Sequence, residues 1–241
     1  MGIAKDLGCA SIVIPAYEES SNLLELLPSI NREIASTAIN VYEIIVVLPD
    51  FATQNDVQLI EEFGARVVLR EPTNSFGDAL RCGFSAVSRE ADWVITMDAD
   101  GSHAPETIPR LLAASPLVDV VVASRYAAGG SSDNALASRL MSRGLNAVYG
   151  IVLGIRCKDI STNFKRYRSK DLMELDLKCQ NFDIVEEIFF RLKVLNGDSF
   201  NVLEIPDHFF DRKHGQTKRR LGPFIVSYIR TLLRLRWQLR R

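Results

Sequence analysis

Short apolar runs rich in β-branched residues alternate along the chain with segments whose apolar residues recur every three or four positions. The runs predict buried strands, and the segments between most of them predict helices. Such alternation is typical of an α/β sheet of mostly parallel strands flanked by helices. The strands are expected at residues 10–15, 43–48, 65–69, 93–97, 118–123 and 201–205.

The pattern changes after residue 124. Residues 127–134 are small and polar, which predicts a flexible loop over a site. Helices are expected at residues 135–153, 182–194 and 222–241. In the last of these helices polar residues recur at three- and four-residue steps, so they form one stripe while apolar residues occupy the rest of the surface. The stripe consists of Ser227, Arg230, Thr231, Arg234, Gln238 and Arg241.

The last helix has two interpretations. Its wide apolar face, Trp237 and its cationic polar face suit a membrane interface with anionic lipid headgroups. Alternatively, the helix packs on the body of the protein and its arginines face water. On either interpretation we divide the chain into a domain at residues 1–220 and a C-terminal amphipathic basic helix at residues 221–241. No apolar run approaches the roughly 20 residues of a membrane-spanning helix.

Composition narrows the choice of partners. The chain has 241 residues, 47% of them hydrophobic, which is enough for one large core. Ten of its 29 Lys and Arg residues lie in residues 212–241, where there is no Asp or Glu, so an anionic partner is expected there. That segment lacks interleaved stacking aromatics, which argues against nucleic acid. Four scattered cysteines and the lack of an apolar leader predict a cytoplasmic protein. With the basic C-terminal helix, we expect it to be peripheral at the cytoplasmic face of the membrane.

Two carboxylates follow the predicted strand at residues 93–97. Asp98 and Asp100 are separated by one residue, and ligands bind beyond the carboxyl ends of strands in open parallel sheets. Carboxylate oxygens suit Mg²⁺ or Mn²⁺, which can bridge them to a diphosphate. An Asp-X-Asp pair is also common in turns and helix starts, but its place after a core strand favours a metal site. His103 could add a ligand or hydrogen-bond to one.

Six motifs in order along the chain carry a resemblance to a known family. The chain resembles the family 2 glycosyltransferases, and within them the dolichol-phosphate mannosyltransferase-like, or polyprenyl-phosphate glycosyltransferase, group. The resemblance runs from Ser11 to about Lys218 and implies the GT-A (Rossmann-like) fold. The motifs lie at residues 12–19, 74–83, 98–106, 124–130, 159–165 and 212–218.

The resemblance implies roles for particular residues. Binding of the nucleotide sugar falls to Pro15, Tyr17, Glu18, Asp50, Gly77, Arg81, Asp98 and Ala99. Residues at the reaction centre are Asp100, Arg125, Arg212 and Lys218. Contacts to the acceptor fall to Arg139, Ser142 and Asp159.

The chain also departs from the family pattern. Leu48 and Pro49 stand where paired acids typically read the nucleotide base, so that role passes to Asp50 or to backbone groups with Arg70 or Glu71. The choice between a GDP- and a UDP-linked donor is therefore open. Asn163 and Lys165 stand where glycine and arginine are more usual.

The expected reaction is a single inverting displacement, with a polyprenyl phosphate as acceptor and mannose or glucose as the favoured sugar. A phosphate oxygen is already anionic, so it needs positioning more than a general base. One alternative is transfer to a saccharide hydroxyl, with Asp159 or Glu187 as the base. Another is a catalytically silent subunit that only binds nucleotide sugars.

Overall fold

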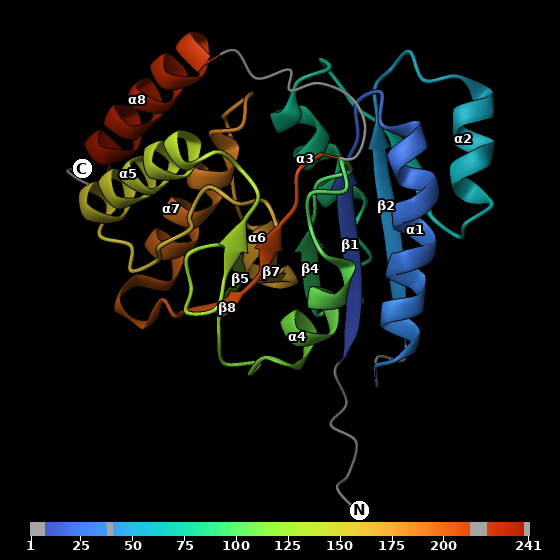
Figure 1. Ribbon diagram of the computed structural model, residues 1–241, viewed down its shortest axis with the longest axis horizontal. Coiled ribbons are helices and arrows are strands. Elements are labelled where there is room, and N and C mark those ends of the chain that lie inside the picture. Colours follow the sequence, from blue (N-terminus) through green and yellow to red (C-terminus); the bar gives the residue numbers. More distant parts are fainter. Residues whose placement is uncertain (1–7, 38–40, 213–220, 239–241) are drawn as a thin grey trace, which may run out of the picture.

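A seven-stranded sheet forms the centre of the molecule (Figure 1). The computed structural model describes residues 8–37, 41–212 and 221–238. The strand order is β3-β2-β1-β4-β7-β5-β8, and a separate two-stranded sheet pairs β6 with β9. The strands are β1 Cys9–Pro15, β2 Val41–Leu48, β3 Arg66–Leu69, β4 Trp93–Thr96, β5 Val120–Ser124, β6 Ser131–Ser132, β7 Lys165–Arg168, β8 Val202–Pro206 and β9 His208–Phe209.

Neighbouring strands of the large sheet are parallel except where β7 is inserted. This strand runs antiparallel to both β4 and β5, and it places Lys165 beside Thr96 and Val122. The six strands expected from apolar runs are present within two residues of their predicted bounds. The sequence did not predict β7, whose four residues include three cations.

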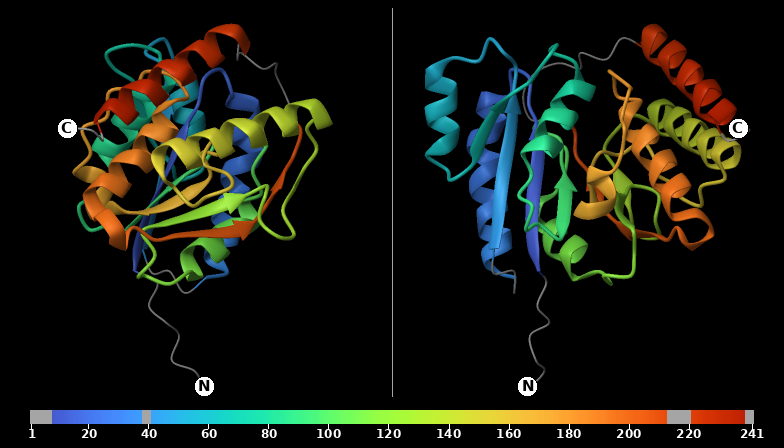
Figure 2. Two further views of the ribbon diagram at one scale, coloured as in Figure 1. Left: turned by 90° about the vertical axis from the view of Figure 1, so that its left-hand side faces the viewer. Right: turned by 180° about the vertical axis from the view of Figure 1, so that it is seen from behind.

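Helices cover both faces of the sheet (Figure 2). One apolar cluster joins one face to α1 and α4, and a second joins the other face to α3, α5, α6, α7 and α8. Strand β1 shows why: Ile12 and Ile14 enter the first cluster and Val13 the second, as a period of two requires. The helices are α1 Ser20–Ala35, α2 Gln54–Glu61, α3 Phe76–Ala86, α4 Ile108–Ala113, α5 Leu136–Leu153, α6 Ser169–Met173, α7 Ile184–Asn196 and α8 Leu221–Gln238, with 3-10 turns at Pro105–Thr107 and Gly197–Ser199.

The predicted loop at residues 127–134 is partly ordered into a strand. Ser131 and Ser132 form β6, which pairs with His208 and Phe209 of β9. The Ser131 hydroxyl lies 2.6 Å from Nδ1 of His208, whose Nε2 lies 3.1 Å from Asp133. These contacts tie the loop to the segment that follows β8.

Helix α8 lies beside α5 and packs on the body of the protein (Figures 1 and 2). Tyr228 and Leu235 are buried, and the backbone oxygen of Tyr228 accepts a 2.8 Å hydrogen bond from the Tyr149 hydroxyl. The predicted polar stripe is wrong at Thr231. This residue is buried, and its hydroxyl donates a hydrogen bond to Asp183. Packing therefore takes part of the stripe away from solvent.

Candidate active site

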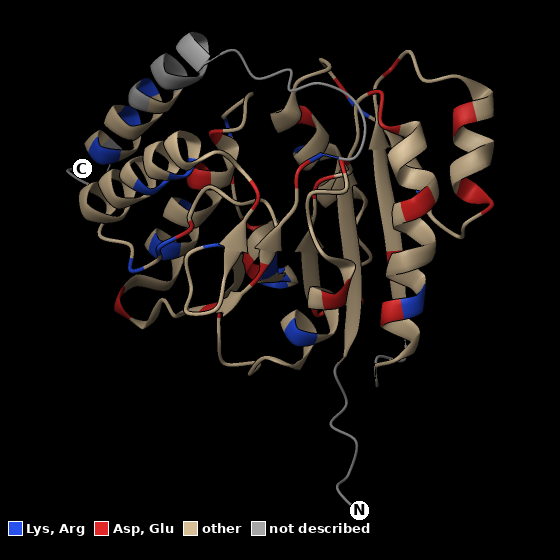
Figure 3. Ribbon diagram, viewed as in Figure 1, with Lys and Arg blue, Asp and Glu red and all other residues tan. Residues whose placement is uncertain are grey.

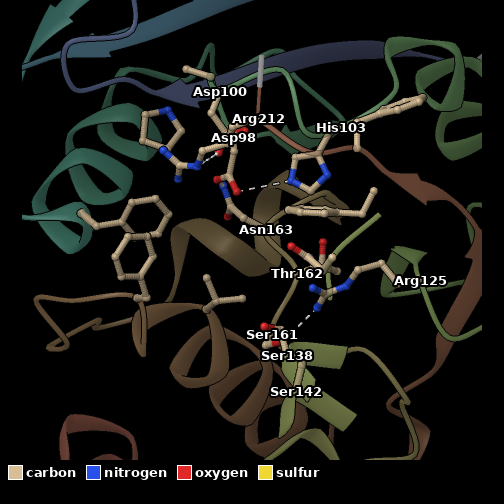
Figure 4. A pocket seen from close by; sticks show the side chains of 18 of the residues that line it. Asp98, Asp100, His103, Arg125, Ser138, Ser142, Ser161, Thr162, Asn163 and Arg212 are labelled. Carbon is tan, nitrogen blue, oxygen red and sulfur yellow. Dashed lines mark hydrogen bonds and ion pairs between the residues drawn. The ribbon is translucent and has the colours of Figure 1, made fainter. Parts of the chain in front are cut away.

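A cavity of about 610 Å³ opens at the edge of the sheet where β1 and β4 end, and α5, α7 and α8 contribute its far wall. The described part of the chain has no helix long and apolar enough to cross a bilayer. Figure 4 shows the cavity with its carboxylates at one end and its hydroxyls at the other. The predicted residues that line it are Pro15, Tyr17, Asp98, Ala99, Asp100, Arg125, Ser142 and Arg212.

The Asp98 carboxylate faces the cavity just beyond β4. Its Oδ1 accepts a 3.0 Å hydrogen bond from the Asn163 side-chain amide, and its Oδ2 lies 3.4 Å from Nε2 of His103. Burial opposes protonation of His103, but the hydrogen bond and charge of Asp98 raise the pKa of the imidazole above its ordinary value. The ring is held between Phe164 and Phe209, so His103 supports Asp98 from behind.

Asp100 is nearly buried and has two separate sets of contacts. Its Oδ1 accepts hydrogen bonds from the backbone amide and hydroxyl of Ser102, which fix the carboxylate. Its Oδ2 lies 2.9 Å from Nε of Arg212, whose Nη1 lies 3.6 Å from Glu19. Arg212 therefore lies at the same end of the cavity as the acids. Lys218, the other cation predicted for this loop, lies outside the described residues.

The donor set fits a hard divalent cation that is shared with a substrate. Mg²⁺ is usually held by one or two carboxylates together with substrate phosphates, rather than by a complete cage of protein ligands. Asp98 and Asp100 supply two carboxylates that line one cavity. Among the described residues no three His, Cys, Asp or Glu side chains form a closed metal site. Two carboxylates fill only part of the coordination shell of such a cation, and substrate oxygens can fill the rest.

Arg125 and Asp159 form a buried ion pair beside the cavity. The Asp159 carboxylate is fully buried and accepts hydrogen bonds from Nε and Nη2 of Arg125 at 2.8 and 2.6 Å, and from the Arg125 backbone amide at 2.9 Å. Burial lowers the pKa of Arg125, but the hydrogen bonds and charge of Asp159 raise it above its ordinary value, so the guanidinium stays charged. Asp159 acts behind Arg125 and does not line the cavity.

Hydroxyl groups line the far end. Ser138 and Ser142 lie four residues apart on α5 and share one face of that helix. The Ser161 hydroxyl also lines the cavity and accepts a 3.2 Å hydrogen bond from Nη2 of Arg125. Arg139 lies on α5 between the two serines but does not line the cavity. Ser138 and Ser161 were not predicted from the sequence, although the four-residue spacing from Ser142 was a signal for Ser138.

The other end of the cavity suits a flat ring. Tyr17 lines the cavity. The centre of its ring lies 5.6 Å from the centre of the Phe51 ring and 5.6 Å from the guanidinium carbon of Arg70. Arg70 is nearly buried and donates to the backbone oxygens of Ala16, Val47 and Asn74, so it shapes the site through the backbone. Burial lowers the pKa of Arg70.

Asp50 and Glu18 lie just outside the cavity. Asp50 is exposed and exchanges two hydrogen bonds with Asn74, of 2.7 and 3.1 Å, which fix the position of its carboxylate. Glu18 has a φ of 56°, a conformation that non-glycine residues seldom adopt. This turn directs Glu19 into the cavity.

Gly77 and Arg81 act behind the wall of the cavity. The Gly77 backbone amide donates to the oxygen of Gln180 at 2.7 Å, and a Cβ on Gly77 would lie 2.2 Å from the oxygen of Cys179. Arg81 donates to that same oxygen at 2.6 Å. Neither residue lines the cavity; both tie α3 to the segment before α7.

The two carboxylates considered as bases for a hydroxyl acceptor are already occupied. Asp159 accepts three hydrogen bonds from Arg125. Glu187 is fully buried and accepts from the backbone amides of Lys178 and Cys179 and from the side chain of Arg191. Neither lines the cavity, so neither is in reach of an acceptor hydroxyl there.

Comparisons with known proteins agree with this geometry. The family described as "Glycosyl transferase family 2" matches residues 11–177. The undecaprenyl-phosphate mannosyltransferase of Micrococcus luteus is 29% identical over 94% of this chain and 95% of its own length. The dolichol-phosphate mannosyltransferase of Pyrococcus furiosus is 33% identical over 95% of this chain, which spans 64% of that longer protein.

Solved structures share the fold. Glucosyl-3-phosphoglycerate synthase from Mycobacterium tuberculosis, in complex with Mn²⁺, uridine diphosphate and glucosyl-3-phosphoglycerate, superimposes with a TM-score of 0.68 at 21% identity, over 95% of this chain and 80% of that one. This likeness confirms the GT-A fold expected from the resemblance. With a family match over well over half of its length and an acid pair at the expected strand end, the chain belongs to glycosyl transferase family 2.

Proposed function

We propose that the protein is a metal-dependent, inverting glycosyltransferase that moves a hexose, mannose or glucose favoured, from a nucleoside diphosphate sugar to a polyprenyl phosphate. The observation that carries this proposal is a single cavity with two unlike ends. Asp98 and Asp100 line one end, and Arg125 with the α5 serines lines the other. The names of the Micrococcus luteus and Pyrococcus furiosus relatives, both polyprenyl-phosphate mannosyltransferases, support it.

The acid end suits the donor. Mg²⁺ or Mn²⁺ held by Asp98 and Asp100 would neutralise the charge that develops on the departing diphosphate. The neighbouring synthase was crystallised with Mn²⁺ and uridine diphosphate, which supports a divalent cation here. Arg212, 2.9 Å from Asp100, can offer its planar fork of donors to a phosphate, and Lys218 remains a predicted second cation. A GDP- and a UDP-linked donor both remain candidates.

The serine end suits the acceptor phosphate. Arg125 keeps its charge, and the hydroxyls of Ser138, Ser142 and Ser161 can donate to the remaining phosphate oxygens. Arg139 follows Ser138 directly on α5 and stays a predicted contact to the acceptor. A phosphate oxygen needs no base, which agrees with the occupied state of Asp159 and Glu187.

An apolar wall continues from the serine end. Phe76 and Phe182 stack with ring centroids 4.5 Å apart, and Met141, Leu145 and Tyr228 complete the wall. These side chains suit the first isoprene units of a lipid acceptor, whereas a free saccharide would leave them in contact with polar groups.

The experiment that tests the function is a panel of donors and acceptors. The purified protein is incubated with Mn²⁺ and GDP- or UDP-linked mannose or glucose, with a polyprenyl phosphate, a free oligosaccharide or no acceptor. We expect transfer to the lipid phosphate only, and loss of transfer when EDTA removes the metal. Transfer to the oligosaccharide alone would contradict the lipid acceptor, and binding of the donor without any transfer would identify a silent subunit.

We also propose that the face formed by α5 and α8 contacts the membrane. Ile151 of α5 is 81% exposed and Leu233 of the neighbouring α8 is 65% exposed, and Trp237 follows Leu233 by four residues on α8. Figure 3 marks the Lys and Arg positions of the described part of α8 in blue, and this part carries no acidic residue. Apolar side chains flanked by cations suit anionic lipid. The protein would then sit peripherally, beside its lipid substrate.

Introducing carboxylates on this face is expected to release the protein from vesicles. In the variant Ile151→Glu/Leu233→Glu, loss of apolar contact and added repulsion should lower the bound fraction in vesicles of phosphatidylcholine and phosphatidylglycerol by about tenfold. Sedimentation of the vesicles measures the bound fraction. Leu117→Glu is the matched control, because Leu117 is 78% exposed in the loop before β5. Equal binding by wild type and the double variant would contradict the proposed contact.

A further inference from the structure

Lys165 is a cation in the core of the protein. It is the first residue of β7, its side chain is fully buried, and no carboxylate of the described residues lies within ion-pair distance of its Nζ. The Nζ atom instead donates to the backbone oxygens of Ile160, at 2.8 Å, and Thr162. It also lies 4.9 Å from the centre of the Phe189 ring. A buried charge costs free energy unless such contacts compensate it. The two backbone oxygens and the aromatic ring therefore explain why the protein tolerates a buried ammonium group here.

The backbone that Lys165 holds is a turn between the two ends of the cavity. In this turn, residues 160–163, the Asn163 amide donates to Asp98 at 3.0 Å. The Ser161 hydroxyl accepts from Arg125 at 3.2 Å and from Asn146 at 3.0 Å. Figure 4 shows that the turn runs from Asn163 beside Asp98, past Thr162, to Ser161 beside Ser138 and Ser142. A shift of this turn would therefore move contacts at both ends together.

We propose that Lys165 is a positioning residue for sugar transfer: its ammonium group fixes the turn 160–163, and through Asn163 and Ser161 it holds Asp98 and Arg125 in register across the cavity. This inference rests on the proposed function. Two of the three ammonium donors bind the turn, and the Nζ atom also lies 4.9 Å from the centre of the Phe189 ring, so the geometry needs a cation with several donors. A methionine would fill similar space but would leave two buried carbonyl groups unpaired.

The environment of Lys165 makes its charge sensitive to pH. Burial lowers the pKa of the ammonium group to about 8, with Cys157, Glu186 and Asp159 acting to raise it and Arg125 acting to lower it. Below pH 8 the charged form holds the turn. Above pH 8 the neutral amine keeps two N–H donors but loses the charge that strengthens its hydrogen bonds. The contribution of Lys165 to turnover should therefore decline as the pH rises through 8.

Two substitutions test the role, with a matched control. Lys165→Met should lower kcat by about 100-fold, because a displacement near 1 Å at the reacting groups costs that much, while the KM values change only a few-fold. Lys165→Arg keeps a charge at every accessible pH, so it should lack the decline of kcat near pH 8 that wild type shows. Lys193→Met is the control, since Lys193 also donates to two backbone oxygens, those of Leu153 and Gly154, away from the cavity, and it should keep wild-type kcat.

Calorimetric titration with Mn²⁺ and UDP or GDP supplies a readout without turnover. Lys165→Met should bind the metal–nucleotide pair about tenfold more weakly than wild type, since Asn163 no longer supports Asp98. A wild type inactive with every acceptor would contradict the proposed function, and this binding difference would still test Lys165.

Three results would overturn the inference: wild-type kcat and binding in Lys165→Met, the same alkaline decline in Lys165→Arg and wild type, or a comparable loss in Lys193→Met. Circular dichroism shows whether each variant folds. If neither Lys165 variant folds, the wild-type profile decides, because a kcat that stays constant from about pH 7 to 9.5 contradicts a turn held by this ammonium group.

Discussion

Replacing Asp100 with alanine is expected to lower kcat for sugar transfer by about a thousandfold or more. The substitution removes one of the two carboxylates proposed to hold a divalent cation, and such a cation would stabilise the transition state by several kcal/mol. It also removes the 2.9 Å contact that holds Arg212 at the donor end. Initial rates with a radiolabelled nucleotide sugar and a polyprenyl phosphate measure the loss, and calorimetry with Mn²⁺ should show weaker uptake of the nucleotide.

Asp176→Ala provides the matched control for Asp100→Ala. Asp176 is an exposed aspartate paired with Lys178 at 2.6 Å, and surface pairs of this kind contribute little to stability. The control should keep wild-type rates and melting temperature. Near-normal transfer by Asp100→Ala, with lipid phosphate in excess, would falsify the assignment of the metal site.

Replacing Arg125 with alanine is expected to reduce both stability and activity. Asp159 is fully buried and would lose all of its side-chain partners, and an uncompensated buried charge costs about 3–5 kcal/mol. In a domain of this size that loss lowers the melting temperature by on the order of 10 °C. Loss of the guanidinium should also reduce kcat/KM for polyprenyl phosphate by about 100-fold, because the acceptor anion loses its charged partner.

A double variant separates these two effects. Arg125→Met/Asp159→Leu replaces the ion pair with apolar side chains, which recovers most of the lost stability in comparable cases. Thermal melts should show the recovery, while the acceptor assay should still show the loss of kcat/KM. Recovery of activity together with stability would mean that Arg125 is needed only for folding.

Within the seven-stranded sheet, the sequence predicted the six apolar strands and missed β7. β7 consists of Lys165, Arg166, Tyr167 and Arg168, a pattern that indicates a solvated segment when only the sequence is considered. The structure buries it because tertiary carbonyl groups accept its protons: Arg166 donates to backbone oxygens at the end of α4 and stacks over Trp93 at 4.0 Å. Such partners lie about 50 residues away in the chain, so no local pattern reveals them.

The candidate site was predictable where residue type and strand end coincide. Asp98 and Asp100 line the cavity, as expected from their charges and their place after a predicted strand, and Arg125 and Arg212 line it as the family resemblance implied. Membership in a family motif alone did not distinguish residues that line the cavity from residues that pack behind its wall. Gly77 was expected to contact the nucleotide, whereas the backbone of residues 179–180 approaches it too closely for a side chain.

The reversed direction of β7 has a consequence for how the enzyme can diversify. Because Lys165 begins β7 beside the end of β4, the chain leaves the sheet after β5 and returns to it at the same edge. The segment between β5 and β7 contains α5 and the serine end of the cavity. Both ends of this segment lie near the cavity. It can be lengthened or exchanged without altering strand pairing in the half that holds the donor. On the proposed function, a change in this segment would alter the acceptor end of the cavity and leave the donor end as it is.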